Sequence, residues 1–498
     1  MTTQPPAGAA QPVPRTSNDQ LRDTAARAES RPPLKKGDMM LNADIGPGAD
    51  MADAELSGVD LTGRDLGGAN FHGGNLAGAI LAGANLAGAR FTAAGLTDAD
   101  LSRANLTGAV LQGADLGDAC LHGANLRRAD LDDMTAPRTL APGAILRHAY
   151  LRRADLRDAN LQMTDLRDAD LEGALLNDAH LDGARLAGAV LRGADMTGVR
   201  LSDANLENAA MREANLESAR LRNAALHGAV FLSANLKGAD LCGSDLRQVD
   251  LQGADLHGAL YDGDTHFPRR VDPVAEGATQ IGPSADLTSA DLKGFDLHGR
   301  DLSRADLRKA DLRGAYLQHA NLRDARLDRA RLHGAIVDTR TRFPEGFDLK
   351  ASGVYAIHPK FSFAGRELRW VNMRGVSLAG AQFRKADLTG ADFSDAYLDG
   401  VDMRSADLTT ALLRFAALDA ADLSGATMKG AVLDSASLMD ANLSGATLRW
   451  ADLTEANLCR ANLEGADLSG AWFRRARYDK TTVFPDGFDA TQAGMILT

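Results

Sequence analysis

The sequence predicts an elongated, all-β solenoid, and three observations lead to this prediction. The chain has 498 residues, well beyond the length at which one hydrophobic core stops growing, so it needs several domains or a repeat architecture. It contains 50 glycines and only 5% aromatic residues, which is untypical of a core packed with large side chains. A five-residue repeat also runs from about residue 50 almost to the C-terminus.

Each repeat carries a large apolar residue at every fifth position and a small residue, usually Ala, two positions earlier, as in Ala104-Asn105-Leu106. A period of five fits neither the 3.6 residues of a helical turn nor the alternation of a strand. Residues two apart share a face of extended backbone. The large and small residues therefore point inward, the residue between them points outward, and the next two form a corner. The inward column includes Leu106, Leu156, Leu206, Leu256, Leu302, Leu408 and Leu458.

This pattern resembles that of the pentapeptide-repeat family, and the resemblance covers nearly the whole chain after residue 50. The resemblance implies a right-handed quadrilateral parallel β-helix, in which four five-residue units form one square coil. Neighbouring coils would stack about 4.8 Å apart through backbone hydrogen bonds.

Breaks in the inward column predict the domain organisation. The column runs from residue 51 to 131, resumes in register over 146–261, and shifts for the runs 287–337 and 363–478. Residues 132–145, which contain two prolines, are predicted to form a loop insertion. The predicted units are listed by residue range: a disordered Pro/Ala-rich tail at 1–45, and solenoids at 46–278, 279–354 and 355–498, stacked or hinged.

A second motif follows each solenoid, at residues 261–278, 337–354 and 478–498, and it resembles the tails that close many pentapeptide-repeat proteins. The first copy departs from the motif at residues 269–271. Each copy either ends an independent solenoid or replaces one coil of a kinked rod; we favour the first reading, because proline and the paired phenylalanines suit a cap. The motif residues are Tyr261, Phe267, Pro268, Phe343, Pro344, Phe347, Phe484, Pro485 and Phe488.

Charge and leader patterns narrow the function classes. The net charge of -12 comes from 67 acids against 55 bases. Lys and Arg alternate with Asp and form no basic stripe, so we do not expect direct binding to nucleic acid. No signal peptide or apolar membrane span is visible. We expect a cytoplasmic protein, with export by a machine that needs no cleaved signal left open.

No catalytic, cofactor or metal motif is found in the sequence. Histidines such as His122 and His298 follow inward residues by one place and are expected on the surface. Cys120, Cys242 and Cys459 are far apart and at outward positions, so we interpret them as incidental. We therefore expect a protein that is not an enzyme and has no cofactor.

Aspartates directly before inward residues are the most numerous charged feature. They are expected to stack outward into acidic columns that either solvate the rod or imitate the phosphate spacing of duplex DNA. The residues singled out are Asp240, Asp245, Asp250, Asp255, Asp286, Asp291, Asp296 and Asp301.

The leading functional hypothesis is a non-enzymatic bacterial scaffold or adaptor that binds other proteins through flat faces. There are also three narrower possibilities, and the resemblance implies the first two. Large family members accompany type VI secretion apparatus and its effector proteins, and short members bind DNA gyrase and protect it from quinolones or toxins. The third possibility is a self-assembling rod, with an end-to-end homodimer formed through residues 493–498.

Overall fold

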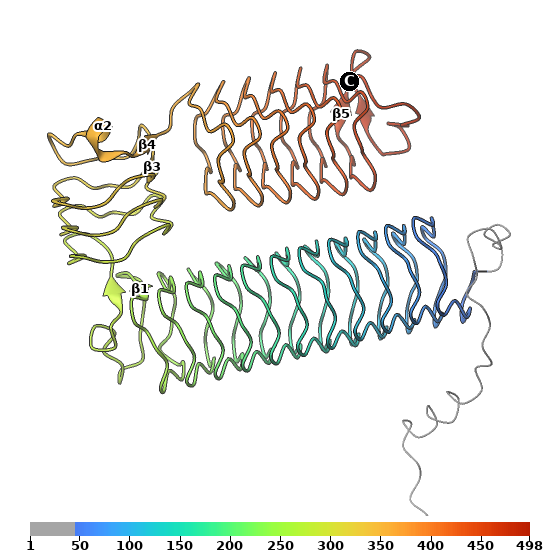
Figure 1. Cartoon of the computed structure of the whole chain (residues 1–498), viewed down its shortest axis with the longest axis horizontal. Helices are drawn as coiled ribbons and strands as arrows, with labels where there is room; N and C mark the ends of the chain where they lie inside the picture. The colour runs from blue at the N-terminus through green and yellow to red at the C-terminus, as the bar shows by residue number, and fades with distance from the viewer. Residues whose placement is uncertain (1–44) are drawn as a thin grey trace, which may run out of the picture.

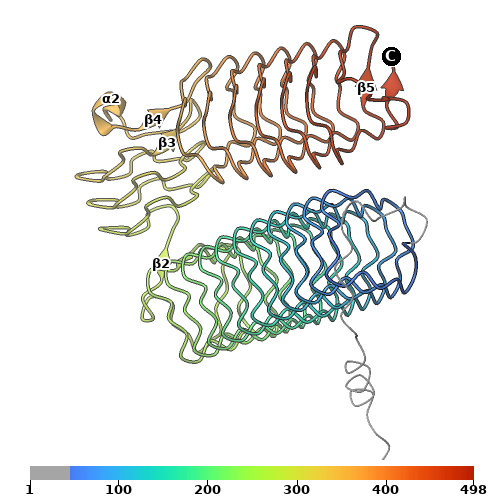
Figure 2. The same cartoon turned by 45° about the vertical axis from the view of Figure 1, so that its right-hand side comes forward.

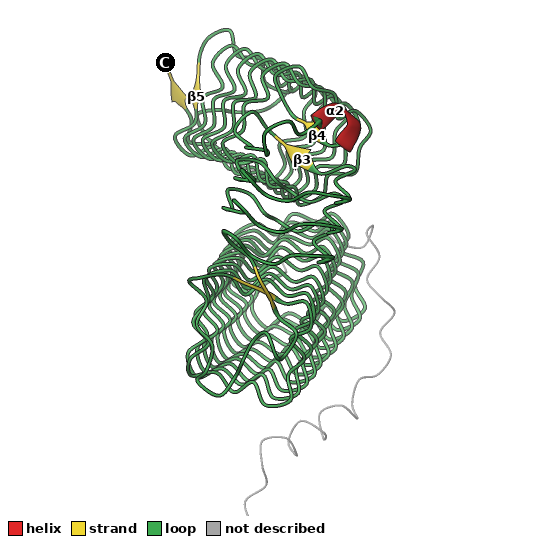
Figure 3. Cartoon of the chain, turned by 90° about the vertical axis from the view of Figure 1, so that its left-hand side faces the viewer, coloured by secondary structure: helices red, strands yellow, loops and turns green. Residues whose placement is uncertain are grey.

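The computed structural model describes residues 45–498, so the predicted N-terminal tail lies almost wholly outside the described residues. The chain forms a right-handed quadrilateral β-helix, which confirms the predicted fold class. Figure 3 shows the coils stacked one on another when the molecule is viewed along the rods. Nearly every extended segment is a single residue long, so the fold is defined by the ladder between coils rather than by long strands.

One coil comprises 20 residues, as shown by the parallel bridge between Asn105 and Asn125. The N–H of Leu106 donates to the carbonyl of Asn125 at 2.7 Å, and the N–H of Asn105 donates back to the coil before. The Asn105 side chain accepts from the N–H of Thr107, which explains why Asp and Asn recur at this position. The second corner residue, Gly108, has a φ of 64°, where glycine has no steric penalty.

The inward column lies along the axis of each solenoid and forms its hydrophobic core. The seven leucines singled out from the sequence are each at most 3% exposed, and five of them have a buried alanine two positions earlier: Ala104, Ala154, Ala204, Ala406 and Ala456. Coil after coil therefore stacks Leu on Leu and Ala on Ala. The seven leucines are Leu106, Leu156, Leu206, Leu256, Leu302, Leu408 and Leu458.

The predicted loop insertion at 132–145 was wrong, because these residues form regular coil with unbroken bridges. Ala136 and Ala141 take the inward position here, and Met134 fills the place of the usual alanine, so the large and small residues exchange places at similar total volume. Pro137 and Pro142 occupy first corner positions. The backbone N–H of that position makes no ladder bond elsewhere in the stack, so proline costs nothing there.

Each copy of the second motif, which we call a terminator, leaves the last coil of its solenoid and returns beside it in a parallel pair of short strands. The pairs are β1 (Leu260–Tyr261) with β2 (Thr279–Gln280), β3 (Ile336–Val337) with β4 (Tyr355–Ala356), and β5 (Arg477–Tyr478) with β6 (Ile496–Leu497). The second terminator also holds α2 (Leu349–Ser352).

An aspartate and a threonine fix the start of each terminator in the same way. Asp338 accepts from the N–H of Thr341 at 2.9 Å, and the Thr341 hydroxyl donates to the carbonyl of Leu317 in the coil before. The pairs Asp262–Thr265 and Asp479–Thr482 repeat this arrangement. The aromatic residues of the motif pack together, for example Phe343 on Phe347 and Phe484 on Phe488.

The rod bends where the first two terminators lie. Leu260 points outward from its own coil, yet it is 2% exposed because the core of the next solenoid packs on it. Ile336 occupies the equivalent place before the third solenoid and belongs to that solenoid's core. The third equivalent, Arg477, is charged and exposed. An outward apolar residue at this position thus seats the next solenoid.

Two bends give the molecule a hairpin shape. The N-terminal arm (residues 46–260) leads to a middle block (281–337), and the C-terminal arm (357–478) runs back beside the N-terminal arm in the opposite direction (Figures 1 and 2). Contacts between residues more than 300 positions apart, such as Lys429 with Asp98, hold the arms together.

Candidate functional site: the seam between the two arms

One face of the N-terminal arm is covered by the C-terminal arm, and we call this contact the seam. On most faces the residue before the inward leucine is partly exposed, but in the five coils of this face from Asp100 to His180 its exposed fraction is at most 4%. The buried residues of the face stand on successive coils and pair with one another in the ladder. They are Asp100, Cys120, Leu140, Asn160 and His180.

All three tryptophans of the chain lie in the C-terminal arm at the seam. Trp450 packs on Cys120 and Leu140. The ring of Trp472 lies 3.8 Å from that of His122, and Trp370 packs edge-on against His180 at 5.2 Å. Trp370 and Trp450 occupy the corner position with positive φ, 58° and 57°, which bulky residues rarely adopt. The corner turns both rings toward the other arm.

Trp450 also contacts a lysine of its own arm, and Trp370 contacts an arginine of the other arm. The Lys429 ammonium lies 4.9 Å from the Trp450 ring centre and donates to Asp98 of the opposite arm at 2.9 Å. The Arg200 guanidinium lies 5.2 Å from the Trp370 ring centre and donates to the backbone carbonyl of Trp370 at 2.8 Å. Each contact links the arms through a charge and an aromatic face.

Residues later in the C-terminal arm contact residues earlier in the N-terminal arm. The Arg103 guanidinium lies over the Trp472 ring, Trp450 meets Cys120, and Trp370 meets Arg200. Because both arms share the same 20-residue coil, they lie coil against coil in antiparallel register.

Burial in the seam changes the acidity of two histidines. Desolvation lowers the pKa of His122 to about 4, against a smaller opposite effect of Asp452. Desolvation also lowers the pKa of His180, whose Nε2 lies 2.7 Å from an Asp182 carboxylate oxygen. His122 is therefore neutral at pH 7 and suits packing against an aromatic ring.

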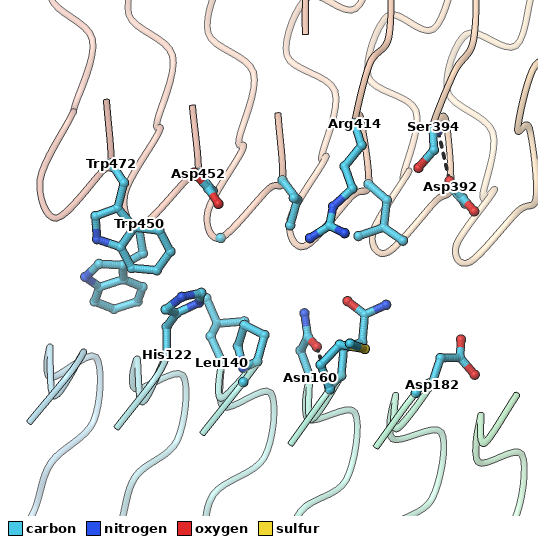
Figure 4. Close-up of a pocket in the computed structure, with 18 of the residues that line it drawn as sticks. His122, Leu140, Asn160, Asp182, Asp392, Ser394, Arg414, Trp450, Asp452 and Trp472 are labelled. Atoms are coloured by element: carbon cyan, nitrogen blue, oxygen red, sulfur yellow. Dashed lines mark hydrogen bonds between the residues drawn. The ribbon is translucent and has the colours of Figure 1, made fainter. Parts of the chain in front are cut away.

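The seam is not filled throughout, because a cavity of about 440 Å³ lies between the arms (Figure 4). Its N-terminal-arm side includes Leu140 and Asn160, and its C-terminal-arm side includes Asp392, Leu412 and Asp452. In Figure 4 the side chains of Leu140 and Asn160 point from one arm, and those of Asp392 and Asp452 from the other, toward the space between them. The volume is that of a small-molecule site.

A second cavity of about 320 Å³ continues the first toward the bend and shares Asp182 and Asp392 with it. Arg222 joins the N-terminal arm to the middle block there, because it pairs with Asp240 of its own arm at 3.2 Å and donates to the carbonyl of Asp296 in the middle block. Asn372 of the C-terminal arm donates to the Asp296 carboxylate. This polar junction fixes the bend of the hairpin.

The expected acidic columns were wrong, because residues five apart lie on different faces of one coil. Asp240, Asp245, Asp250 and Asp255 form a ring around the axis rather than a line along it. A column needs a spacing of 20, and the ladder of residues 45–498 joins aspartate to aspartate only in separate pairs. These pairs are Asp286–Asp306, Asp291–Asp311, Asp387–Asp407 and Asp402–Asp422; Asp296 meets Tyr316 and Asp301 meets Asn321.

The expectation that the outward histidines and cysteines are plain surface residues also needs correction. His122 and His298 are largely desolvated, and Cys120 and Cys242 are at most 1% exposed. All four point outward from their own coil, as the repeat predicts. A second solenoid covers Cys120, His122 and Cys242, which the pattern of a single coil does not show.

Reactive chemistry finds little support in the described part of the chain. Burial raises the pKa of the Cys120 and Cys242 thiols far above the usual range, so neither is a nucleophile at neutral pH. Within residues 45–498, no group of three or more His, Cys, Asp and Glu side chains could hold a metal ion. No helix of these residues is long and apolar enough to cross a membrane.

Known proteins share this repeat. HetL, a pentapeptide repeat protein involved in heterocyst differentiation regulation from the cyanobacterium Nostoc sp. strain PCC 7120, is 30% identical over 49% of this chain and 96% of its own, with a TM-score of 0.24. QnrB1, a plasmid-mediated fluoroquinolone resistance protein, is 18% identical over 34% and 84%, with a TM-score of 0.28. A thylakoid-lumen pentapeptide repeat protein from Arabidopsis thaliana is 31% identical over 21% and 67%, with a TM-score of 0.15.

No curated protein matches the chain. The family model described as "Pentapeptide repeats (8 copies)" matches it in overlapping stretches that together span residues 54–133, 143–260, 284–337, 367–404 and 406–477. These stretches cover most of both arms and the middle block, so the chain belongs to the pentapeptide-repeat family.

Proposed function

We propose that the protein is a non-enzymatic scaffold that binds other proteins on the outer faces of the hairpin, whose two arms pack together at the seam. One observation carries the proposal: an apolar strip on the face of the N-terminal arm opposite the seam. Val190, Ala210 and Val230 stand on three successive coils of this face, point outward and are partly exposed. Tyr150, 48% exposed, lies on the same face two coils before Val190.

The strip fits a protein partner for a physical reason. Most outward positions of the arm carry Asp, Asn or Arg, which solvate the surface. Contiguous apolar residues on a flat, rigid face lower the cost of desolvation when a partner binds, and the rigid coil loses little entropy.

Binding can be tested by affinity capture from the native host with matched variants. The double variant Val190→Lys, Val230→Lys should lose the proteins that the wild type retains, because the added charges oppose burial of the strip. Ala225→Lys, at an exposed outward position of another face, should retain them. Equal recovery with all three proteins would show that this strip binds no partner.

Gyrase binding through imitation of DNA has weaker support. A DNA-like surface needs acidic groups repeated along the axis, whereas the ladder of residues 45–498 has no acidic run longer than that of Glu367, Asp387 and Asp407. Type VI secretion and end-to-end assembly stay predictions. Ile496 and Leu497 of β6, 45% and 54% exposed, are the residues through which end-to-end assembly would form.

A further inference from the structure

We propose that the cavity in the seam binds an elongated organic dication, a linear diamine with an uncharged middle, and thereby locks the arms together. The proposal rests on the order of residues along one line of the C-terminal arm. Asp392, Leu412, Val432 and Asp452 follow one another on successive coils of that line, and all four line the cavity.

The two carboxylates lie at the ends of an apolar stretch. Coils stack about 4.8 Å apart, so the backbone positions of Asp392 and Asp452 are roughly 14 Å from each other. Leu412 and Val432 lie between them, and Leu140 and Pro142 of the N-terminal arm line the opposite side. A molecule with charged ends and an aliphatic body matches this arrangement along its length.

Each carboxylate has an oxygen available for a ligand. Oδ1 of Asp392 accepts from the N–H of Ser394, and Oδ1 of Asp452 accepts from the N–H of Thr454, both at 2.9 Å. No residue of 45–498 donates to Oδ2 of either aspartate or forms an ion pair with it. An ammonium group would supply the missing charge-assisted hydrogen bond at each end.

The cations near the cavity are already engaged elsewhere. Arg374 pairs with Asp395 and Arg414 with Asp434, each at 2.9 Å, and neither acid lines the cavity. His122 has a pKa of about 4 and carries no charge at pH 7. Arg414 points into the middle of the space (Figure 4), which disfavours a ligand with a positive charge at its centre.

Asn160 supplies an independent sign of a ligand. It is 2% exposed, and its Oδ1 accepts from the N–H of Gln162, which fixes the orientation of the amide. Nδ2 then points into the cavity (Figure 4) and donates to no residue of 45–498. This donor faces the cavity without a protein acceptor, so an oxygen in the middle of the ligand should bind more tightly than a plain methylene chain.

Calorimetric titration of the full chain with diaminoalkanes from butane to dodecane tests the length of the site. We expect one-to-one binding with an optimum at intermediate length, and weaker binding of octylamine, which has one charge, and of octanedioate, which has the opposite charges. The diamine of octane length with two ether oxygens should bind better than diaminooctane, and Asn160→Leu should abolish that difference.

Matched variants test the ends of the site. Asp392→Asn and Asp452→Asn keep Oδ1 for the local turn, so the fold is retained, and each should weaken diaminooctane binding about tenfold or more. Asp407→Asn alters the same repeat position of the same arm on another face and should leave binding unchanged.

Absence of binding, affinity that only rises with chain length, or equal weakening by Asp407→Asn would each overturn the proposal. None of these outcomes bears on the apolar strip, because the strip lies on the opposite face of the N-terminal arm and is tested by protein capture.

Discussion

The axis of each arm and the seam between the arms are made from the same repeat but differ in composition. The axis is uniform: leucine stacks on leucine, and the seven leucines singled out from the sequence are at most 3% exposed. The seam combines tryptophans, ion pairs, neutral histidines and a cavity of about 440 Å³. Every fifth residue builds the axis, whereas every twentieth residue builds the seam.

This difference separates two kinds of information in the sequence. The five-residue period determines that the chain coils, and almost any residue is tolerated at the outward position of a coil. The choice of outward residue then determines which face another solenoid covers. The fold is therefore insensitive to the substitutions that decide the shape of the whole molecule.

The largest effect is expected on the axis. Leu206→Asp places a charge without a partner in an apolar core and should lower the free energy of unfolding by more than about 4 kcal/mol. Asn205→Asp keeps the oxygen that accepts from the N–H of Glu207 and should change it by less than about 0.5 kcal/mol. Thermal unfolding of both variants checks this, and equal melting temperatures would contradict the inward assignment of Leu206.

A smaller effect is expected at the first bend. Leu260→Arg introduces the residue found at the equivalent exposed position, Arg477, and removes the apolar contact that seats the middle block. The loss should be about 2 to 5 kcal/mol, confined to that junction. Small-angle scattering should report a more extended molecule. Arg477→Lys serves as the control, and an unchanged scattering profile for Leu260→Arg would refute the role of this contact.

The seam itself can be opened from the aromatic side. Trp450→Ala removes the ring that covers Cys120 and should cost about 3 kcal/mol of contact between the arms. Thiol labelling followed by mass spectrometry should then detect modified Cys120. Cys242, which the middle block covers instead, is the internal control and should stay unmodified. Protection of Cys120 in the variant would mean that the arms stay closed without the tryptophan.

The smallest effect concerns pH. The pKa of His122 is about 4 in the closed hairpin and about 6.5 when exposed, so the open state takes up the proton first. The closed state therefore loses stability as the pH falls from 6.5 toward 4. Tryptophan fluorescence should report this change. His122→Gln should reduce it and His227→Gln, at an exposed position, should not; identical pH profiles would exclude His122 as the cause.

The sequence predicted the axis well and the seam poorly, for a physical reason. A period of five is a local pattern, because four successive repeats form one coil, so it is visible in the sequence. It placed Leu106 and Leu408 correctly in the core. The seam depends on residues 20 apart in each arm and on pairs several hundred apart, which no local pattern reveals.

Two signals for the seam were nevertheless present in the sequence. All three tryptophans lie in the C-terminal arm, and two of them occupy corner positions where glycine or a small polar residue is usual. Reading the outward residues at intervals of 20 would also have singled out Cys120 and Leu140 as an apolar pair between polar neighbours. The same interval of 20 would have shown that aspartates five apart lie on different faces and form no acidic column.

The antiparallel register of the arms constrains how their lengths can change in evolution. A lone β-helix gains or loses a whole coil at little cost, because each coil meets only its neighbours. In this hairpin, deleting one coil near the bend of the N-terminal arm would slide Cys120 past Trp450 and shift every later pairing by one coil. A matching deletion in the opposite arm would restore the pairs. We therefore expect that a coil gained or lost in one arm is matched by a coil gained or lost in the other.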